Sequence, residues 1–104
     1  MDVILTLNAE DNLWQIYKYH SAYSEDYAVN FQTDITRYLI STLSRHPELG
    51  RLYNESKGIR RLVYETRYNV YYTVGETVNV IFILDGRLQL NLGLASSDLD
   101  FPTN

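Results

Sequence analysis

Residues 67–84, RYNVYYTVGETVNVIFIL, contain two runs in which apolar and other side chains alternate. Alternation with a period of two predicts β-strands with one buried face. The alternating apolar residues are Tyr68, Val70, Tyr72, Val78, Val80, Phe82 and Leu84. The Gly75–Glu76 pair between the runs is typical of a tight turn, so residues 67–74 and 77–84 should form a hairpin.

The same period continues on both sides of this hairpin. Residues 59–66 alternate upstream and predict another strand, and residues 88–94 alternate downstream and predict a last one. Asp85–Gly86 is a turn signal between the last two strands. Residues 48–58 show no alternation and predict a loop.

The N-terminal half has a different period. A short alternating run over residues 2–7 predicts a strand, and Asn8 then reads as the cap of a helix over residues 9–22. Apolar residues recurring at three and four predict a second helix over residues 24–46. Pro47 ends it, because the residue before a proline avoids the helical region.

These elements predict an α+β fold. A small, twisted, mostly antiparallel β-sheet should pack against an N-terminal α-helical hairpin. The residues expected in the core are Phe31, Ile35, Leu39, Leu43, Leu62, Val70, Val80 and Phe82. We expect a single domain over residues 1–95 and an acidic, flexible tail over residues 96–104.

The composition excludes several classes of protein. The chain has 104 residues, no Cys and two His, so a disulfide scaffold and a Cys nucleophile are ruled out and a metal site is not expected. No cofactor motif is visible. The N-terminus lacks the pattern of a signal peptide, and the most apolar stretch is far shorter than the ~18–20 residues of a membrane span. We therefore expect a cytoplasmic protein without a membrane partner.

Charge is distributed unevenly along the chain. The net charge is -4, which argues against a protein that binds duplex DNA through its phosphates. Residues 51–75 nevertheless hold five basic residues against two acidic ones. A local basic segment in an acidic protein indicates a binding site. Solvated arginines, or arginines paired with Glu55 and Glu65, are the alternative interpretation.

Motifs across residues 2–90 occur in a definite order. The helical half carries Ala9-x-x-x-Leu13-x-x-Ile16-Tyr17, Ala28-x-x-Phe31-x-x-x-Ile35 and Leu43-x-x-x-Pro47-x-x-Gly50-Arg51. The sheet half carries Gly58-x-Arg60-Arg61-Leu62, Tyr68-x-Val70-x-Tyr72-x-Val74 and Val78-x-Val80-Ile81-x-Ile83-x-Asp85-Gly86-Arg87. Together they resemble the RelE/ParE family, whose members are toxins of bacterial toxin–antitoxin modules. The family's small sheet with a two-helix hairpin matches the fold predicted from periodicity.

The resemblance implies two alternative activities. A ParE-like toxin of the plasmid stabilisation type would inhibit a protein target, DNA gyrase, and be neutralised by a cognate antitoxin. A RelE-like toxin would be a ribosome-dependent mRNA endoribonuclease, with cationic side chains holding the scissile phosphate. Its candidate catalytic residues are Arg60, Arg61, Arg67, Arg87 and Tyr64. The His and Tyr that nuclease members carry near the C-terminus are absent from residues 88–104, which favours the ParE-like interpretation.

Candidate contacts with the antitoxin or target come from two features. The basic residues are Arg51, Lys57, Arg60, Arg61, Arg67 and Arg87. Ten tyrosines are too many for the core of a chain this size, and Tyr17, Tyr23 and Tyr27 cluster around the first helix, where tyrosine is suited to protein interfaces. Ordinary surface tyrosines are the alternative. Asp85, next to Gly86–Arg87, forms a turn and can also hold a guanidinium in place.

Overall fold

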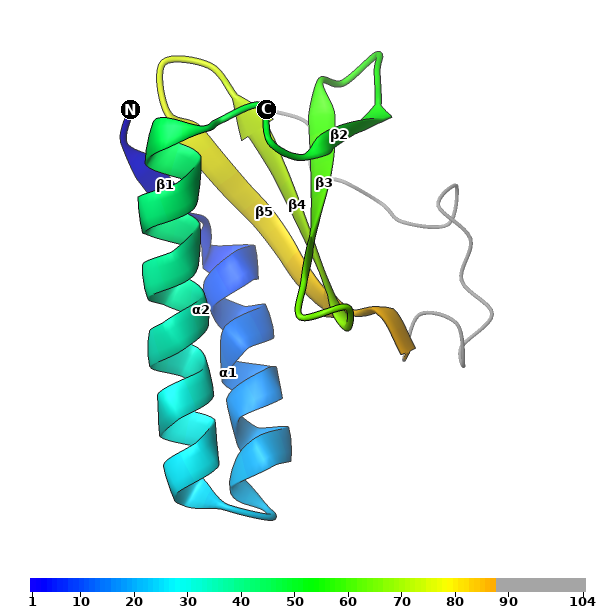
Figure 1. Ribbon diagram of the computed structural model, residues 1–104. Coiled ribbons are helices and arrows are strands. Elements are labelled where there is room, and N and C mark those ends of the chain that lie inside the picture. The colour runs from blue at the N-terminus through cyan, green and yellow to red at the C-terminus, as the bar shows by residue number, and fades with distance from the viewer. Residues whose placement is uncertain (88–104) are drawn as a thin grey trace.

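A computed structural model of the protein describes residues 1–87. Two helices and five strands form a helical hairpin beside a twisted sheet (Figure 1). In chain order they are β1 (Val3–Leu5), α1 (Leu7–Ser21), α2 (Glu25–Arg45), β2 (Arg51–Asn54), β3 (Ile59–Tyr64), β4 (Tyr68–Val74) and β5 (Val78–Asp85). The α+β prediction is confirmed. The strand predicted over residues 88–94 and the tail over residues 96–104 lie outside the described residues.

Side-chain caps set the start of both helices. The Ser24 hydroxyl accepts the Tyr27 N–H at 3.2 Å and begins α2, in agreement with the sequence. The cap of α1 is Thr6, whose hydroxyl accepts the Ala9 N–H at 3.3 Å, so the prediction of Asn8 as the cap is wrong. Thr6 has an extended backbone at the end of β1, the conformation that a cap requires, whereas Asn8 already lies in the first helical turn. Neither helix combines the length and the apolar content of a membrane span.

The five strands form one sheet in the order β1-β5-β4-β3-β2. β1 runs parallel to β5, and every other neighbouring pair is antiparallel. The sheet is therefore mostly antiparallel, as predicted. β2 lies within residues 48–58, where the sequence predicted only a loop. Its four residues, Arg51–Asn54, are too few to show an alternating pattern.

The main core lies between the hairpin and the sheet. Phe31 is 6% exposed, and Ile35, Leu39, Leu43, Val70 and Val80 are 0% exposed, which confirms six predicted core residues. Leu62 is half-buried at the margin of this core. Buried tyrosines of β4 supply much of the sheet side, and Tyr68 and Tyr72 lie on the buried face that the alternation predicts.

A β-bulge interrupts the alternation in β5. Tyr72 pairs with Val80 and Tyr71 pairs with Phe82, so Ile81 is an extra residue without a partner in β4. One extra residue turns every later side chain to the opposite face. Ile83 and Asp85 therefore face the helices. Phe82 is half-buried on the other face, where it packs against a second cluster of Ile59 and Tyr71, so its prediction as a core residue is wrong.

One buried hydrogen bond anchors the loop that precedes β2. The Gly50 N–H donates to the Tyr72 hydroxyl at 2.7 Å, and a Cβ built on Gly50 would lie 2.8 Å from that oxygen. Glycine is required here because the loop backbone approaches a fully buried tyrosine.

The Tyr72→Phe substitution should lower the free energy of unfolding by about 1–3 kcal/mol, because it leaves the buried Gly50 N–H without an acceptor. Urea unfolding followed by circular dichroism measures the change. Tyr23→Phe is the matched control, since Tyr23 is 81% exposed, and it should leave stability unchanged. Equal stability of the two variants would contradict this role for the Tyr72 hydroxyl.

Candidate functional site

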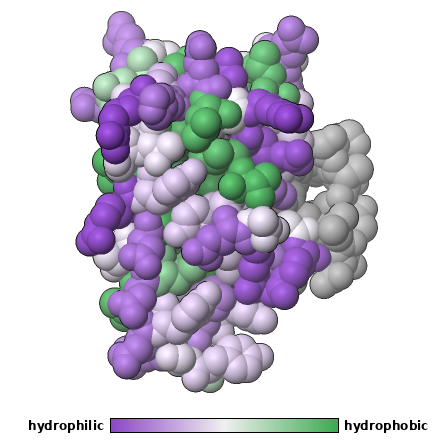
Figure 2. All heavy atoms as spheres, viewed as in Figure 1, coloured by the Kyte–Doolittle hydropathy of each residue, from purple (hydrophilic) through white to green (hydrophobic). Residues whose placement is uncertain are grey.

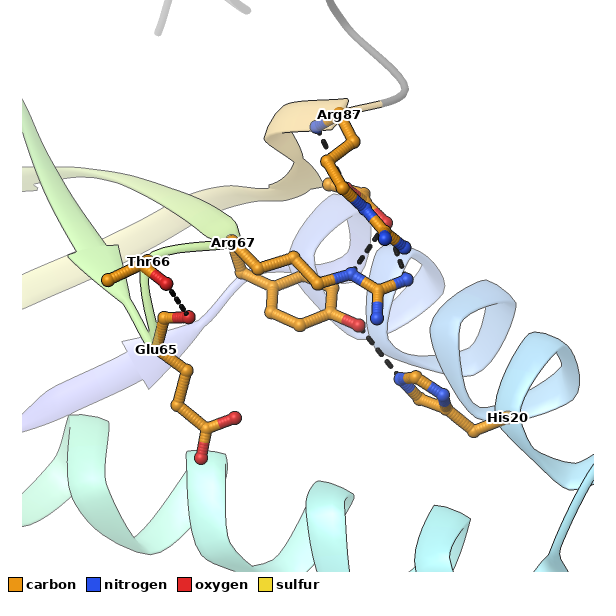
Figure 3. Close-up of polar contacts among 7 residues, drawn as sticks. His20, Glu65, Thr66, Arg67 and Arg87 are labelled. Atoms are coloured by element: carbon orange, nitrogen blue, oxygen red, sulfur yellow. Dashed lines mark hydrogen bonds and ion pairs between the residues drawn. The ribbon is translucent and has the colours of Figure 1, made fainter.

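The turn between β3 and β4 has an unusual backbone. Glu65 and Thr66 have φ values of 52° and 57°, in the left-handed region that β-branched residues such as Thr rarely adopt. The Arg67 N–H closes the turn by donating to the Tyr64 carbonyl at 3.1 Å. Figure 3 shows Arg67 extending from this turn toward the end of β5.

Arg67 forms an ion pair with Asp85. Its Nε and Nη2 both donate to Oδ2 of Asp85, at 3.0 and 2.9 Å. The other carboxylate oxygen, Oδ1, accepts the Arg87 N–H at 2.9 Å and lies 3.7 Å from the Arg87 Nε (Figure 3). Burial raises the pKa of Asp85, but the hydrogen bonds from Arg67 and the Arg87 backbone outweigh it and hold the pKa below its ordinary value. Asp85 is thus an ionised anchor for two arginines.

A buried histidine lies beside this ion pair. His20 is 6% exposed, and its Nε2 lies 2.8 Å from the Tyr68 hydroxyl. Burial, together with the positive charge of Arg67, lowers the pKa of His20. Burial raises the pKa of Tyr68 to about 12. Both groups are therefore neutral at pH 7 and share a hydrogen bond between α1 and β4 (Figure 3).

Aromatic rings enclose the histidine and the arginine. The rings of Tyr27 and Phe31 lie 4.9 and 5.1 Å from the His20 ring, centroid to centroid. The Arg67 guanidinium lies 5.0 Å from the Tyr68 ring centroid and 5.6 Å from that of Tyr19. Such contacts hold a guanidinium in place in addition to its ion pair. We call His20, Arg67, Tyr68, Asp85 and Arg87 the polar cluster.

A pocket of about 160 Å³ opens beside the polar cluster, between α1 and β5. We call it the α1–β5 pocket. Its lining residues are Asn12, Gln15, Ile16, Tyr19, Arg67, Tyr68, Ile83, Leu84 and Asp85. The bulge in β5 is the reason that Ile83 and Asp85 reach it. The pocket thus combines apolar walls with one charged end.

The structure divides the basic segment predicted over residues 51–75. Arg51 and Arg61 are exposed and directly opposite each other in the register of β2 and β3. Lys57 is exposed in the turn between these strands. Arg67 lies at the other end of β3, in the polar cluster. The predicted site residues therefore occupy two separate regions.

Arg60 and Arg61 lie on opposite sheet faces, as their adjacency in a strand predicts. Arg60 pairs in register with Tyr72, and its Nη1 donates to the Gly50 carbonyl at 2.7 Å and the Glu48 carbonyl at 3.3 Å. Arg61 pairs with Tyr71, and its guanidinium lies 5.6 Å from the Tyr53 ring centroid. Within residues 1–87, neither Arg51 nor Arg61 has an ion pair.

The tyrosines singled out from the sequence have different environments. Tyr23 and Tyr27 are 81% and 51% exposed at the tip of the hairpin. Tyr17 is half-buried and stacks on Trp14, with ring centroids 5.6 Å apart. Tyr64 is 9% exposed, and burial together with the charge of Glu65 raises its pKa. The first three can meet a partner at the surface.

Sequence reasoning missed His20 and Tyr68 as members of a polar cluster. They lie 48 residues apart in the chain, and only the fold brings the C-terminal end of α1 to the start of β4. No motif in the sequence links the two residues. Among residues 1–87, no group of three or more His, Cys, Asp or Glu side chains is arranged to hold a metal ion.

The fold is shared with a protein of known structure. A chain in the solved structure titled "Chromosomal ParDE TA system from P. aeruginosa" is similar to this one, with a TM-score of 0.70 and 20% sequence identity. The likeness covers 82% of this chain and 95% of that chain. It confirms the expected RelE/ParE-like fold. No protein-family model and no curated protein matches the sequence.

His20 should make stability depend on pH. Its pKa in the folded protein is below the ordinary value of 6.5, so the unfolded chain takes up a proton first as pH falls. The contribution of neutral His20 to the free energy of unfolding is complete above pH 6.5. It is lost as the pH falls below 6.5, because the unfolded state then binds more protons than the folded state.

The His20→Gln variant should therefore lose less stability than the wild type between pH 7 and pH 5. Urea unfolding at each pH measures the difference. His46→Gln is the control, because His46 is exposed after α2 and should leave the wild-type pH dependence in place. Identical pH dependence in the wild type and His20→Gln would contradict a buried neutral histidine.

Proposed function

We propose that the protein is the toxin of a bacterial type II toxin–antitoxin module, that it inhibits a protein target, and that a cognate antitoxin neutralises it. The observation that carries the proposal is the likeness to a chain of a ParDE system, which extends over 95% of that chain. DNA gyrase is the proposed target, in line with the resemblance to ParE-like toxins.

The side chains that could act as acid or base in RNA cleavage contribute instead to the packing and hydrogen bonding of the fold. RNA cleavage needs one group to accept the 2′-hydroxyl proton and another to protonate the leaving oxygen. Tyr64 is buried among aromatic rings, with that of Tyr38 at 5.2 Å, and its pKa is raised. The pKa of Tyr68, about 12, keeps its hydroxyl protonated, and Arg67 is already paired with Asp85. Residues 88–104 contain no His, Tyr, Lys or Arg. These features favour a binding protein.

The Arg51–Arg61 pair supports an acidic partner. Like charges directly opposite each other in adjacent strands destabilise a sheet. Both side chains are exposed, and neither has an acidic neighbour among the described residues that would relieve the repulsion. A carboxylate from another protein would supply that relief, and such pairing speeds association.

An apolar surface lies near these arginines. Figure 2 shows apolar side chains gathered in a band on the face of the molecule that it presents. Leu49 and Leu52 are each 51% exposed where the loop after α2 enters β2. Leu62 is half-buried on β3, two residues from Arg60, the register partner of Leu52. An antitoxin segment with apolar residues on one side and acidic residues on the other would cover both this apolar surface and the Arg51–Arg61 pair. Tyr23 and Tyr27 extend the proposed contact surface along the hairpin.

Expression of the protein in a bacterium should stop growth, and co-expression of the small protein encoded by the neighbouring gene should restore it. Purified protein should lower supercoiling by DNA gyrase and leave ribosome-bound mRNA intact. Cuts in that mRNA, lost in the Arg61→Ala variant, would contradict the proposal and favour the endoribonuclease alternative.

Charge reversal at Arg51 and Arg61 should slow association with the antitoxin by about tenfold or more at low salt and flatten its salt dependence. Arg60 is unsuitable for this test, because it donates to the Gly50 carbonyl. Arg37→Glu on α2 is the control for each single variant, Arg51→Glu or Arg61→Glu, because it makes the same change in net charge at an exposed position outside the sheet. Surface plasmon resonance gives the rates. If neither Arg51→Glu nor Arg61→Glu associates more slowly than Arg37→Glu, the pair is not part of the antitoxin site.

A further inference from the structure

The outer edge of β5 is only partly covered by β1. Val3–Leu5 pairs with Val78–Val80, and the Thr6 N–H adds one more bond by donating to the Val80 carbonyl at 3.0 Å. The chain then turns into α1. From Ile81 to Asp85, this side of β5 has no strand partner within residues 1–87.

Side chains replace the missing strand at two positions. The Thr6 hydroxyl donates to the Ile81 carbonyl at 3.3 Å, and the Ile83 N–H donates to Oδ1 of Asn12 at 3.0 Å. In an antiparallel ladder the N–H and C=O of one residue point to the same side, and residues two apart share that side. The Ile83 carbonyl and the Asp85 N–H therefore point to this edge as well. Such an edge is a template for pairing with another chain.

The α1–β5 pocket lies directly along this edge. Ile16 and Tyr19 of α1, Ile83 of β5 and Tyr68 of β4 give it largely apolar walls. Its volume of about 160 Å³ suits one large apolar side chain rather than a whole cofactor. A strand paired with β5 would point alternate side chains toward the helices and into this pocket.

The positive charge at one end of the pocket favours an acidic side chain on the incoming segment. Arg67 and Asp85 neutralise each other, and the Arg87 side chain is 62% exposed beyond them. The polar cluster therefore carries one uncompensated positive charge at neutral pH, because His20 is neutral. A carboxylate on the incoming segment would pair with Arg87 without disturbing the ion pair below it.

We propose that an extended segment of the antitoxin adds to the open edge of β5 at Ile83–Asp85. One large apolar side chain of this segment fills the α1–β5 pocket. An acidic residue two positions further along, on the same side of the segment, pairs with Arg87. The proposal rests on the proposed function, because its occupant is the antitoxin. The proposed contact lies at β5, whereas the Arg51–Arg61 pair lies on β2 and β3 on the other side of the sheet.

A pocket-filling variant tests this contact. Gln15 is exposed on α1 and lines the pocket, so Gln15→Trp should fill it and raise the Kd for the antitoxin of the neighbouring gene about tenfold or more. Asn30→Trp makes the same kind of change on an exposed position of α2 outside the pocket, and should keep the Kd within about twofold. Isothermal titration calorimetry measures both, and circular dichroism checks that both variants are folded.

Hydrogen exchange gives a readout that does not depend on a substitution. In the complex, exchange of the Asp85 amide should slow at least about tenfold relative to the free protein, because a backbone carbonyl of the partner accepts its N–H. Unchanged exchange at Asp85, or a Kd for Gln15→Trp equal to that of Asn30→Trp, would overturn the β5-edge contact while leaving the toxin proposal standing. Absence of any binding by the wild type would overturn the toxin–antitoxin proposal and this contact with it.

Discussion

The β-bulge at Ile81 is the constraint on which the arrangement of the site depends. Before it, Val78 and Val80 point into the core between the sheet and the helices. After it, the alternation is shifted by one residue, so that Ile83 and Asp85 point to the helical face while Phe82 packs on the other side. A regular strand would have turned Asp85 away from Arg67. The bulge therefore brings a carboxylate to the end of β4 and opens the pocket beside α1.

Asp85 then organises the charges around it. It holds Arg67 through two hydrogen bonds to one oxygen and binds the Arg87 backbone with the other. The left-handed residues Glu65 and Thr66 turn the chain so that Arg67 reaches this carboxylate. At the opposite end of β3, Arg51 and Arg61 face each other without such a counter-charge among residues 1–87. The basic segment of the sequence is thus divided into Arg67, which has a counter-charge, and the Arg51–Arg61 pair, which has none among residues 1–87.

Periodicity was sufficient for both helices and for β3, β4 and β5, because each is long enough to show its repeat on one buried face. It failed for β2, which has four residues, and for Phe82, because no local pattern marks an extra residue in a strand. The cap at Thr6 was missed because Asn8 is an equally good capping residue by type. The candidate arginines were found from charge and from the family resemblance, but their separation into two regions depends on pairing between strands. The His20–Tyr68 contact joins residues far apart in the chain and had no sequence signal.

Proton–proton distances in solution reveal whether the side chains of β5 change faces after Ile81. In a nuclear Overhauser spectrum of the protein, the methyl groups of Ile83 should show cross-peaks to side chains of α1, which lines the same pocket. The ring of Phe82 should instead show cross-peaks to the cluster of Ile59 and Tyr71. Cross-peaks from Phe82 to α1, with none from Ile83, would mean that β5 alternates without a bulge and that Asp85 is not turned toward Arg67 by one.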